Sequence, residues 1–281
     1  MQLIVQPDDG VEPLIKAITR ARKTVDIVIF RFDIDKIEEA LTAAVGRGVV
    51  VRALVAHTNR GGESKLRKLE SRLLKAGVTL SRTADDMVRY HGKLLTVDRK
   101  QAFVLGFNYT HQDIERSRSL GLSTRNPRIV ADLTRVIDAD HNRVDLVIKT
   151  SRLVVSPENS RESLSRFIRK AKQELLIYDV GVTDDKMIAI IKERAEAGVK
   201  VRILGGVEQK WRDEVPWRVK AFTSMKLHVR AIIRDRETAF VGSQSLRKLE
   251  LDQRREVGLI TKDRRTVKQM ALVFDADWKR N

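Results

Sequence analysis

Short apolar runs alternate along the chain with segments in which apolar residues recur every three or four positions. The first such segment, 14–21, predicts a helix, and the β-branched run at 25–30 predicts a strand. A second helical segment at 37–44 ends near two glycines and precedes another apolar run at 49–55. Strands that alternate with helices predict an α/β fold, with mixed, mostly parallel β-sheets flanked by helices.

The same order of elements occurs twice in the chain. The segment 48–52, Gly-Val-Val-Val-Arg, recurs as Gly-Val-Lys-Val-Arg at 198–202, an offset of 150 residues. Further along, the offset becomes 137 residues, so the first half carries 13 extra residues in its middle. An internal repeat of this length predicts two lobes of similar fold. We place them at residues 1–145 and 146–281, joined by a short polar link.

Each lobe carries a histidine and a basic residue at the head of an apolar run. In the first lobe these are His91 and Lys93, and Asp98 ends the run at a polar turn. The second lobe repeats the pattern with His228, Arg230 and Asp235. Side chains alternate along a β-strand, so the histidine and the cation two positions later point to the same face. A second apolar run after each turn predicts a β-hairpin, and we expect the two aspartates to be structural.

These paired motifs resemble the HxK(x)4D signature of the phospholipase D superfamily. The resemblance extends over nearly the whole chain, and two copies inside a long repeat are far more specific than one. It implies two lobes, related by a pseudo-two-fold axis, which join their motifs into one site that cleaves phosphodiesters. It also implies a phosphohistidine intermediate and a site that uses neither a metal nor a cofactor. The residues that stand at the family's site positions are His91, Lys93, Asn108, His228, Arg230, Ser245 and Glu256.

The two histidines would supply the acid–base chemistry. Cleavage needs one neutral imidazole that attacks phosphorus and one protonated imidazole that donates to the leaving oxygen. By the family's order, His91 is the nucleophile and His228 is the acid. Lys93 and Arg230 would bind the non-bridging phosphate oxygens, where charge develops in the transition state. Arg230 departs from the family's lysine, and a planar guanidinium is not equivalent to an ammonium group.

The polar residues that follow each motif match the family's pattern only in part. Asn108 matches the asparagine of the family's GSxN tail, which donates a hydrogen bond to phosphate. Ser245 stands at the second position, where its hydroxyl can still donate one bond.

A carboxylate behind the histidine would fix its tautomer and raise its basicity. Glu256 lies 28 residues after His228, whereas the equivalent position of the first lobe is Ser119. We therefore expect Glu256 to support His228, which favours His228 as the nucleophile and opposes the family's order. Asp113 or Glu115 are the acids that could substitute in the first lobe. The order in which the two histidines act stays open.

Composition narrows the substrate to an anion. The 55 Lys and Arg residues exceed the 38 Asp and Glu residues, and the resulting charge of +17 predicts attraction to polyanions. The absence of cysteine excludes disulfides, a thiolate nucleophile and a Cys-ligated metal. Among relatives, two motifs in one chain are typical of lipid enzymes, whereas compact nucleases are often single-motif chains that dimerise. We predict a monomeric, metal-independent phosphodiesterase that hydrolyses or transfers phosphatidyl groups of phospholipids.

Two alternative functions remain. The same residues would serve an endonuclease, because the positive charge suits DNA or RNA as well as an anionic membrane. A degenerate, non-catalytic member would use the basic site only to bind a polyanion, and Arg230, Ser245 and Ser119 are its support. The retention of both histidines argues against it, because a pure binder needs no acid–base pair.

The expected location is the cytoplasm, with peripheral contact at a membrane surface. The N-terminus shows no secretory signal, and no run of about 18 apolar residues predicts a membrane-spanning helix. Segment 63–76 predicts a strongly basic helix, which we expect to be a solvated face rather than a ligand surface. Segment 211–218 holds two tryptophans among arginines, a pattern that suits a lipid interface, base stacking or packing over a sheet edge.

Overall fold

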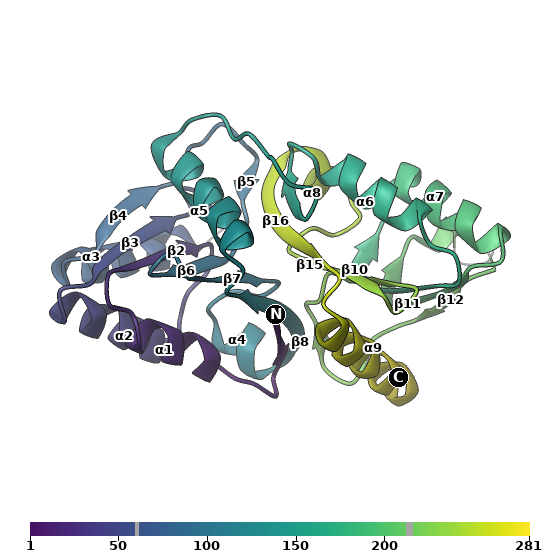
Figure 1. The fold of residues 1–281 in the computed structure, drawn as a ribbon, viewed down its shortest axis with the longest axis horizontal. Helices are drawn as coiled ribbons and strands as arrows, with labels where there is room; N and C mark the ends of the chain where they lie inside the picture. Colours follow the sequence, from purple (N-terminus) through teal and green to yellow (C-terminus); the bar gives the residue numbers. More distant parts are fainter. Residues whose placement is uncertain (60–61, 212–215) are drawn as a thin grey trace.

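A computed structural model describes residues 1–59, 62–211 and 216–281. These residues form two lobes of mixed β-sheet and helices that lie side by side (Figure 1). The N-terminus lies close to the boundary between the lobes, whereas the chain ends on a helix of the second lobe. The predicted α/β fold with two similar lobes is confirmed.

The first lobe follows the predicted alternation of strands and helices. Its elements are β1 (Gln2–Gln6), α1 (Glu12–Thr19), β2 (Thr24–Ile29), α2 (Asp35–Gly46), β3 (Val50–Val55), α3 (Glu63–Lys75), β4 (Thr79–Arg82), β5 (Arg89–Tyr90), β6 (Leu94–Val97), β7 (Gln101–Leu105), α4 (His111–Glu115), β8 (Ser117–Thr124) and α5 (Pro127–Asn142).

The second lobe repeats this order after the link at 143–152. Its elements are β9 (Leu153–Ser156), α6 (Ser160–Arg169), β10 (Glu174–Val182), α7 (Asp185–Glu196), β11 (Lys200–Val207), the short 3-10 helix η1 (Gln209–Trp211), β12 (Arg218–Lys220), β13 (Lys226–Leu227), β14 (Ala231–Arg234), β15 (Thr238–Gly242), α8 (Lys248–Asp252), β16 (Arg254–Thr261) and α9 (Arg264–Arg280).

Both sheets are mixed, as the sequence predicts. The first has the order β1-β8-β7-β6-β2-β3-β4, and the second has the order β12-β11-β10-β14-β15-β16-β5, with β9 beside β16. In the first sheet β2, β3 and β4 are parallel neighbours, whereas the pairs from β2 through β6, β7 and β8 to β1 are antiparallel. Two successive antiparallel pairings restore the original strand direction. Five strands of this sheet therefore run parallel to one another: β1, β7, β2, β3 and β4.

Each lobe adds a short strand to the sheet of the other. β5 of the first lobe pairs with β16 of the second, with Tyr90 opposite Arg255. β13 of the second lobe pairs with β8 of the first, with Leu227 opposite Arg118. These exchanged strands stand immediately before His91 and His228, so the two sheets together fix where both histidines begin.

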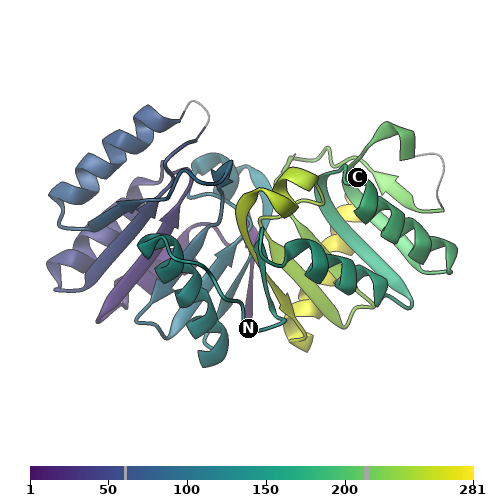
Figure 2. The same ribbon diagram turned by 90° about the horizontal axis from the view of Figure 1, so that it is seen from above.

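A single apolar cluster joins the lobes. It contains residues of β7 and β8 from the first sheet and of β15 and β16 from the second, together with the inner faces of α5 and α9. Figure 2 shows the two lobes meeting along this central region, and each lobe has a further core of its own away from the interface. α5 and α9 each pack on the sheet of their own lobe and also contribute to the apolar cluster at the interface.

Two equivalent ion-pair clusters cross the interface. Arg118 on β8 contacts Asp277 on α9, with Nε 3.0 Å from Oδ2, and its Nη1 lies 3.1 Å from Asp8. The repeat places Arg255 on β16 in the same way. Its Nε lies 2.9 Å from Oδ1 of Asp140 on α5, and its Nη1 contacts a glutamate of the second lobe. Burial raises the pKa of Asp140 to about 6, although Arg255 opposes the shift. Each arginine thereby ties a central strand to the closing helix of the other lobe.

The aspartates that end the two motifs are structural, as predicted. Asp98 has φ 53° at the turn between β6 and β7, and its carboxylate accepts hydrogen bonds from the backbone N–H groups of Arg22, Lys23 and Thr24. Burial raises the pKa of Asp98, but these three donors outweigh it and the net pKa is lowered. Asp235 repeats the turn and its backbone contacts in the second lobe.

The basic helix α3 packs one face on the first lobe and exposes the other, which agrees with the predicted solvated face. Three of its four leucines are buried, whereas Leu74 and most of the basic residues are exposed. Arg72 forms two hydrogen bonds with Glu38 at 2.7 and 2.8 Å. In the second lobe Trp217 is buried in the core, which favours the packing interpretation for this tryptophan. Residues 212–215 of the same segment lie outside the described residues. Over the described ranges, no helix is both long and apolar enough to cross a bilayer.

Asp277→Ala should lower the free energy of unfolding by about 3 to 5 kcal/mol, because it leaves a buried arginine without its main partner. Arg118 and Asp277 are 5% and 2% exposed, whereas Asp8 is too exposed to replace the lost charge fully. The substitution also removes the carboxylate that accepts the hydroxyl of Tyr178 at 2.5 Å. Urea unfolding followed by tryptophan fluorescence measures the change.

Glu162→Ala is the matched control, because it breaks the exposed pair of Glu162 with Arg166 on α6. We expect a change of less than about 0.5 kcal/mol there. Equal effects of the two substitutions would contradict a special role for the interface cluster.

Candidate active site

The backbone of each motif histidine is held by the opposite lobe. The N–H of His91 donates to the carbonyl of Arg255 at 2.7 Å, and the N–H of His228 donates to the carbonyl of Arg118 at 2.9 Å. Both acceptors are the arginines of the interface ion-pair clusters. The two HxK-type motifs therefore meet at the interface between the lobes.

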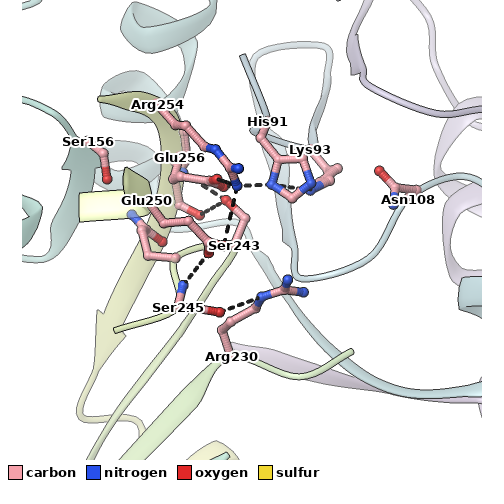
Figure 3. Close-up of polar contacts among 12 residues, drawn as sticks. His91, Lys93, Asn108, Ser156, Arg230, Ser243, Ser245, Glu250, Arg254 and Glu256 are labelled. Atoms are coloured by element: carbon pink, nitrogen blue, oxygen red, sulfur yellow. Dashed lines mark hydrogen bonds and ion pairs between the residues drawn. The ribbon is translucent and has the colours of Figure 1, made fainter. Parts of the chain in front are cut away.

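His91 is paired with a carboxylate from the second lobe. Its Nδ1 lies 2.9 Å from Oε2 of Glu256 (Figure 3). Its ring stands edge-on to Phe30, with 4.5 Å between the ring centroids. The expectation that Glu256 supports His228 is thus wrong. Glu256 lies on β16, next to the residue that pairs with β5, so its side chain faces the histidine that follows β5. Sequence spacing within one lobe cannot show a partner that comes from the other lobe.

His228 has a different acid beside it. Its Nδ1 lies 3.3 Å from Oδ2 of Asp113, without the geometry of a hydrogen bond. Asp113 is itself fixed by Asn108, whose backbone N–H and side-chain Nδ2 donate to it at 3.0 and 2.6 Å. Ser119, the equivalent of Glu256, is fully buried and its hydroxyl has no partner among the described residues. Glu115 lies apart from the site and contacts the exposed ring of His111.

Two basic residues accompany the histidines. The ammonium nitrogen of Lys93 lies 2.9 Å from Nδ1 and 2.8 Å from Nε2 of His91, and the side chain is 1% exposed. Arg230 donates from Nε to the hydroxyl of Ser245 at 3.2 Å and from Nη1 to the carbonyl of His228 at 3.2 Å. Ser245 therefore orients Arg230 in this structure instead of pointing to an open phosphate position.

Burial and the two cations keep both histidines neutral. Burial, followed by the charges of Lys93 and Arg230, lowers the pKa of His91 well below its ordinary value. Burial, followed by Arg230 and then Lys93, does the same to the pKa of His228. Because the same two charges act on both rings, the four side chains share one electrostatic environment. Desolvation also raises the pKa of Glu256, which Lys93 opposes.

Lys93 is close to losing its own proton. Burial is the largest cause that lowers its pKa to about 7, and Arg230 adds to the shift while Glu256 opposes it. The Lys93 ammonium lies almost equally far from both ring nitrogens of His91, so it stands against the ring and not along the Nε2 lone pair. With Glu256 accepting from Nδ1, Nε2 keeps its lone pair.

Two acids that shape the site form a repeat of their own, which the sequence reasoning did not use. Glu250 follows Asp113 by the same 137 residues that separate the histidines. Each accepts the backbone N–H of the tail residue five positions earlier, Asn108 or Ser245, at 3.0 and 2.7 Å. Asp113 was already a candidate from the sequence, and the repeat offset was the signal that would have added Glu250. Over the described ranges, no three His, Asp or Glu residues are placed to hold a metal ion.

Comparisons with known proteins agree with this architecture. A family model described as a cardiolipin synthase, phospholipase D-like domain matches residues 14–141 and 164–278. No curated protein sequence matches the chain significantly.

Solved structures share the fold at low sequence identity. Polyphosphate kinase from Porphyromonas gingivalis superposes with a TM-score of 0.82 and 18% identity, over 99% of this chain and 47% of that one. The present chain thus spans about half the length of that kinase. Phosphatidylserine synthase from Haemophilus influenzae gives a TM-score of 0.72 and 10% identity, over 99% and 86% of the two chains. The nuclease Nuc from Salmonella typhimurium matches 53% of this chain with 97% of its own, at 19% identity and a TM-score of 0.46.

The family model covers most of both lobes, and the two-lobed fold recurs along the whole of the phosphatidylserine synthase match. The chain belongs to the phospholipase D superfamily, among the cardiolipin synthase-like phospholipase D domains.

Proposed function

We propose that this protein is an enzyme that hydrolyses or transfers phosphatidyl groups through a phosphohistidine on His91. One observation carries the assignment of the nucleophile: Nδ1 of His91 contacts the Glu256 carboxylate at 2.9 Å, with the Lys93 ammonium against the same ring. A carboxylate on Nδ1 places the proton there and leaves the lone pair on Nε2. The order of the two motifs in the family and the position of the Glu256 carboxylate now both favour His91 as the nucleophile.

The reaction proceeds in two displacements. Nε2 of His91 forms a bond to phosphorus while the bond from phosphorus to the leaving oxygen breaks, and His228 gives its proton to that oxygen. Lys93 and Arg230 neutralise the charge that develops on the non-bridging oxygens. In the second step, water or an alcohol bonds to phosphorus, its proton passes to His228, and the bond between phosphorus and nitrogen breaks. His91 and His228 are then restored to their starting states.

His228 acquires the proton that it donates when the substrate arrives. In the free protein, burial and the charges of Arg230 and Lys93 hold its pKa low. A bound phosphodiester carries one negative charge, which offsets these cations and raises the pKa of the imidazole. The carboxylate of Asp113, 3.3 Å away, supports the charged form in the same way. Substrate binding is therefore expected to take up a proton.

A phosphatidyl group is the proposed substrate because of the family match and the tandem lobes. The matching model is named for cardiolipin synthase, and the phosphatidylserine synthase structure superposes over nearly all of both chains. Two motifs in one chain complete the proposed site without a dimer, and we propose a monomer. For access to the substrate we propose peripheral contact with an anionic membrane surface, to which the charge of +17 would be attracted.

Cleavage of nucleic acid is the second candidate, favoured by the charge of +17. A single phosphodiester chemistry serves both substrates, so the site residues do not separate them. Hydrolysis of fluorescent phosphatidylcholine or phosphatidylglycerol without nicking of plasmid DNA supports the lipid assignment. The opposite result would replace it with a nuclease. Failure to turn over either class would instead support a binding protein that no longer reacts.

A covalent intermediate tests the assignment of the two histidines. Bis(p-nitrophenyl) phosphate carries a leaving group that departs without acid assistance, so the first step should survive in His228→Ala. That variant should accumulate a phosphorylated protein, which intact-mass measurement after a rapid quench detects. His91→Ala should form no adduct and lose at least about 10³-fold in kcat/KM.

His141→Ala is the control, because this histidine lies at the end of α5, where its ring contacts Ser81. It should retain the wild-type rate. An adduct in His91→Ala with none in His228→Ala would reverse the assigned roles.

The value of kcat/KM should decrease as the pH rises through about 7, because Lys93 loses the charge that binds phosphate. In the free protein, the lowered pKa means that Lys93 carries its charge mainly below about pH 7. The binding of phosphate therefore weakens as the pH rises above that value. In Lys93→Arg the guanidinium stays charged at every accessible pH, so this decrease should disappear although the overall rate is lower. Initial rates between pH 5 and 9 measure both profiles. A decrease near pH 7 that persists in Lys93→Arg would assign it to another group.

A further inference from the structure

One aromatic side chain stands against the reacting groups of the first motif, and the two-displacement mechanism gives it no role. Phe30 directly follows β2 and is 2% exposed. Its ring lies edge-on to the ring of His91, with 4.5 Å between the centroids. The ammonium nitrogen of Lys93 lies over the same phenyl ring, 5.5 Å from its centroid. Phe30 is therefore a neighbour of both functional side chains of this motif.

The repeat provides a valine where the second motif would have this ring. The offset of 150 residues places Val180 at the position of Phe30. A valine has no π system, so it can neither meet an imidazole edge-on nor attract a cation through a ring face. The aromatic ring, like the Glu256 carboxylate, thus accompanies the histidine that is the proposed nucleophile.

The backbone of Phe30 is held by a buried asparagine. Asn59 is 2% exposed, and its Nδ2 donates to the carbonyl of Phe30 at 2.9 Å. Its Oδ1 accepts from Nε of Arg31 at 3.1 Å, and its backbone N–H donates to Oε1 of Glu63 at 2.6 Å. Because its backbone is anchored and its side chain is buried, Phe30 forms a fixed wall beside the site.

A fixed wall matters for His91 because one hydrogen bond does not define the orientation of an imidazole. The torsion that joins Cβ to the ring has broad minima. Glu256 contacts one ring atom, Nδ1, so the ring could still swing about that contact. The edge-on packing against Phe30, with 77° between the ring planes, restricts this rotation. The two contacts together define where the Nε2 lone pair points.

The same ring favours the charged form of Lys93. The face of a phenyl ring carries partial negative charge and attracts a cation, most strongly where water is excluded. Lys93 is 1% exposed, and burial lowers its pKa to about 7. The guanidinium groups of Arg31 and Arg89 also lie over the ring, at 5.7 and 5.3 Å. Unlike a carboxylate, the ring stabilises the ammonium without competing with phosphate for its protons.

The other charged groups around Lys93 do not depend on Phe30. They are the ring of His91 and, in order of decreasing influence, Glu256, Arg230, Asp113 and Glu250. A change in the titration of Lys93 when only Phe30 is replaced therefore measures the effect of the ring.

We propose that Phe30 is a positioning residue that holds the His91 ring and the charged Lys93 side by side for attack on phosphorus. It acts through these two side chains and forms no bond to the substrate. Its place in the reaction rests on the proposed function, whereas the arrangement itself exists in the free protein and can be measured there.

Nuclear magnetic resonance of the free protein tests the arrangement without turnover. Phe30→Leu removes the ring but keeps most of the apolar volume. The titration midpoint of Lys93 should fall by roughly half a pH unit to one unit, because the charged form loses the ring face. His91 should change from one tautomer, with the proton on Nδ1, to a mixture of two.

A trifluorinated phenylalanine at position 30 separates charge from shape. The fluorines withdraw electron density from the ring face but leave the size of the ring almost unchanged. This protein should show the lowered midpoint of Lys93 and should keep the single tautomer of His91.

Kinetics with bis(p-nitrophenyl) phosphate test the effect on the reaction. At the acid end of the pH profile, where Lys93 is charged in both proteins, Phe30→Leu should lower kcat by about tenfold and change KM much less. The decrease of kcat/KM with rising pH should begin at a lower pH than in wild type, because Lys93 loses its proton earlier.

Phe167→Leu is the matched control. Phe167 on α6 is 4% exposed in the core of the second lobe, and the guanidinium of Arg234 lies over its ring at 4.7 Å. The substitution thus removes an equally buried ring with its own cation, away from the site. It should leave the titration of Lys93, the tautomer of His91 and kcat as in wild type.

Each outcome has a separate meaning. If Phe30→Leu titrates and reacts as Phe167→Leu does, the positioning role is overturned. A shifted titration of Lys93 without turnover of any diester supports the arrangement and rejects the proposed function. If the trifluorinated protein matches wild type while Phe30→Leu does not, the ring acts by shape alone and its stabilisation of the Lys93 charge is overturned.

Discussion

The backbone pairing between the lobes is the constraint on which the rest of the structure depends. Each lobe extends the other's sheet by a short strand, and each motif histidine begins where that strand ends. The carbonyls of Arg118 and Arg255 hold the two histidine N–H groups, while the side chains of the same arginines reach Asp277 and Asp140 across the interface. A shift of one lobe would break the ion pairs, expose the shared apolar core and separate the histidines together. Stability and site geometry are therefore coupled.

The electrostatics of the site follow from this docking. Closing the interface removes the histidines and Lys93 from water, and burial is the largest cause of the lowered pKa of all three groups. A neutral imidazole suits a nucleophile, and an ammonium that titrates near neutral pH responds strongly to an anionic ligand. In the free protein that ammonium lies against both ring nitrogens of His91. The charge of a bound phosphodiester would stabilise the protonated form of Lys93 and so complete the site.

The repeat predicts the same side chains at equivalent positions of the two lobes, but several of the site positions differ. Glu256 faces His91, but its equivalent Ser119 leaves His228 to the more distant Asp113. An arginine bound by Ser245 replaces the second lysine. In the proposed mechanism these differences suit His91 to attack and His228 to proton transfer.

The sequence by itself determined the repeat, the elements of each lobe, the mixed sheets and the positions of both motifs. Alternating apolar runs and apolar residues at helical spacing are local signals. The structure confirms the elements that they predict, because each lobe buries those same apolar residues. The sequence also gave the correct structural role to Asp98 and Asp235, since a turn is decided by neighbours. Only the tertiary structure decided that Glu256 contacts His91 and that Asp113 lies beside His228. Those contacts join residues of different lobes or distant loops, and spacing along one strand carries no information about which partner the docked lobes bring opposite.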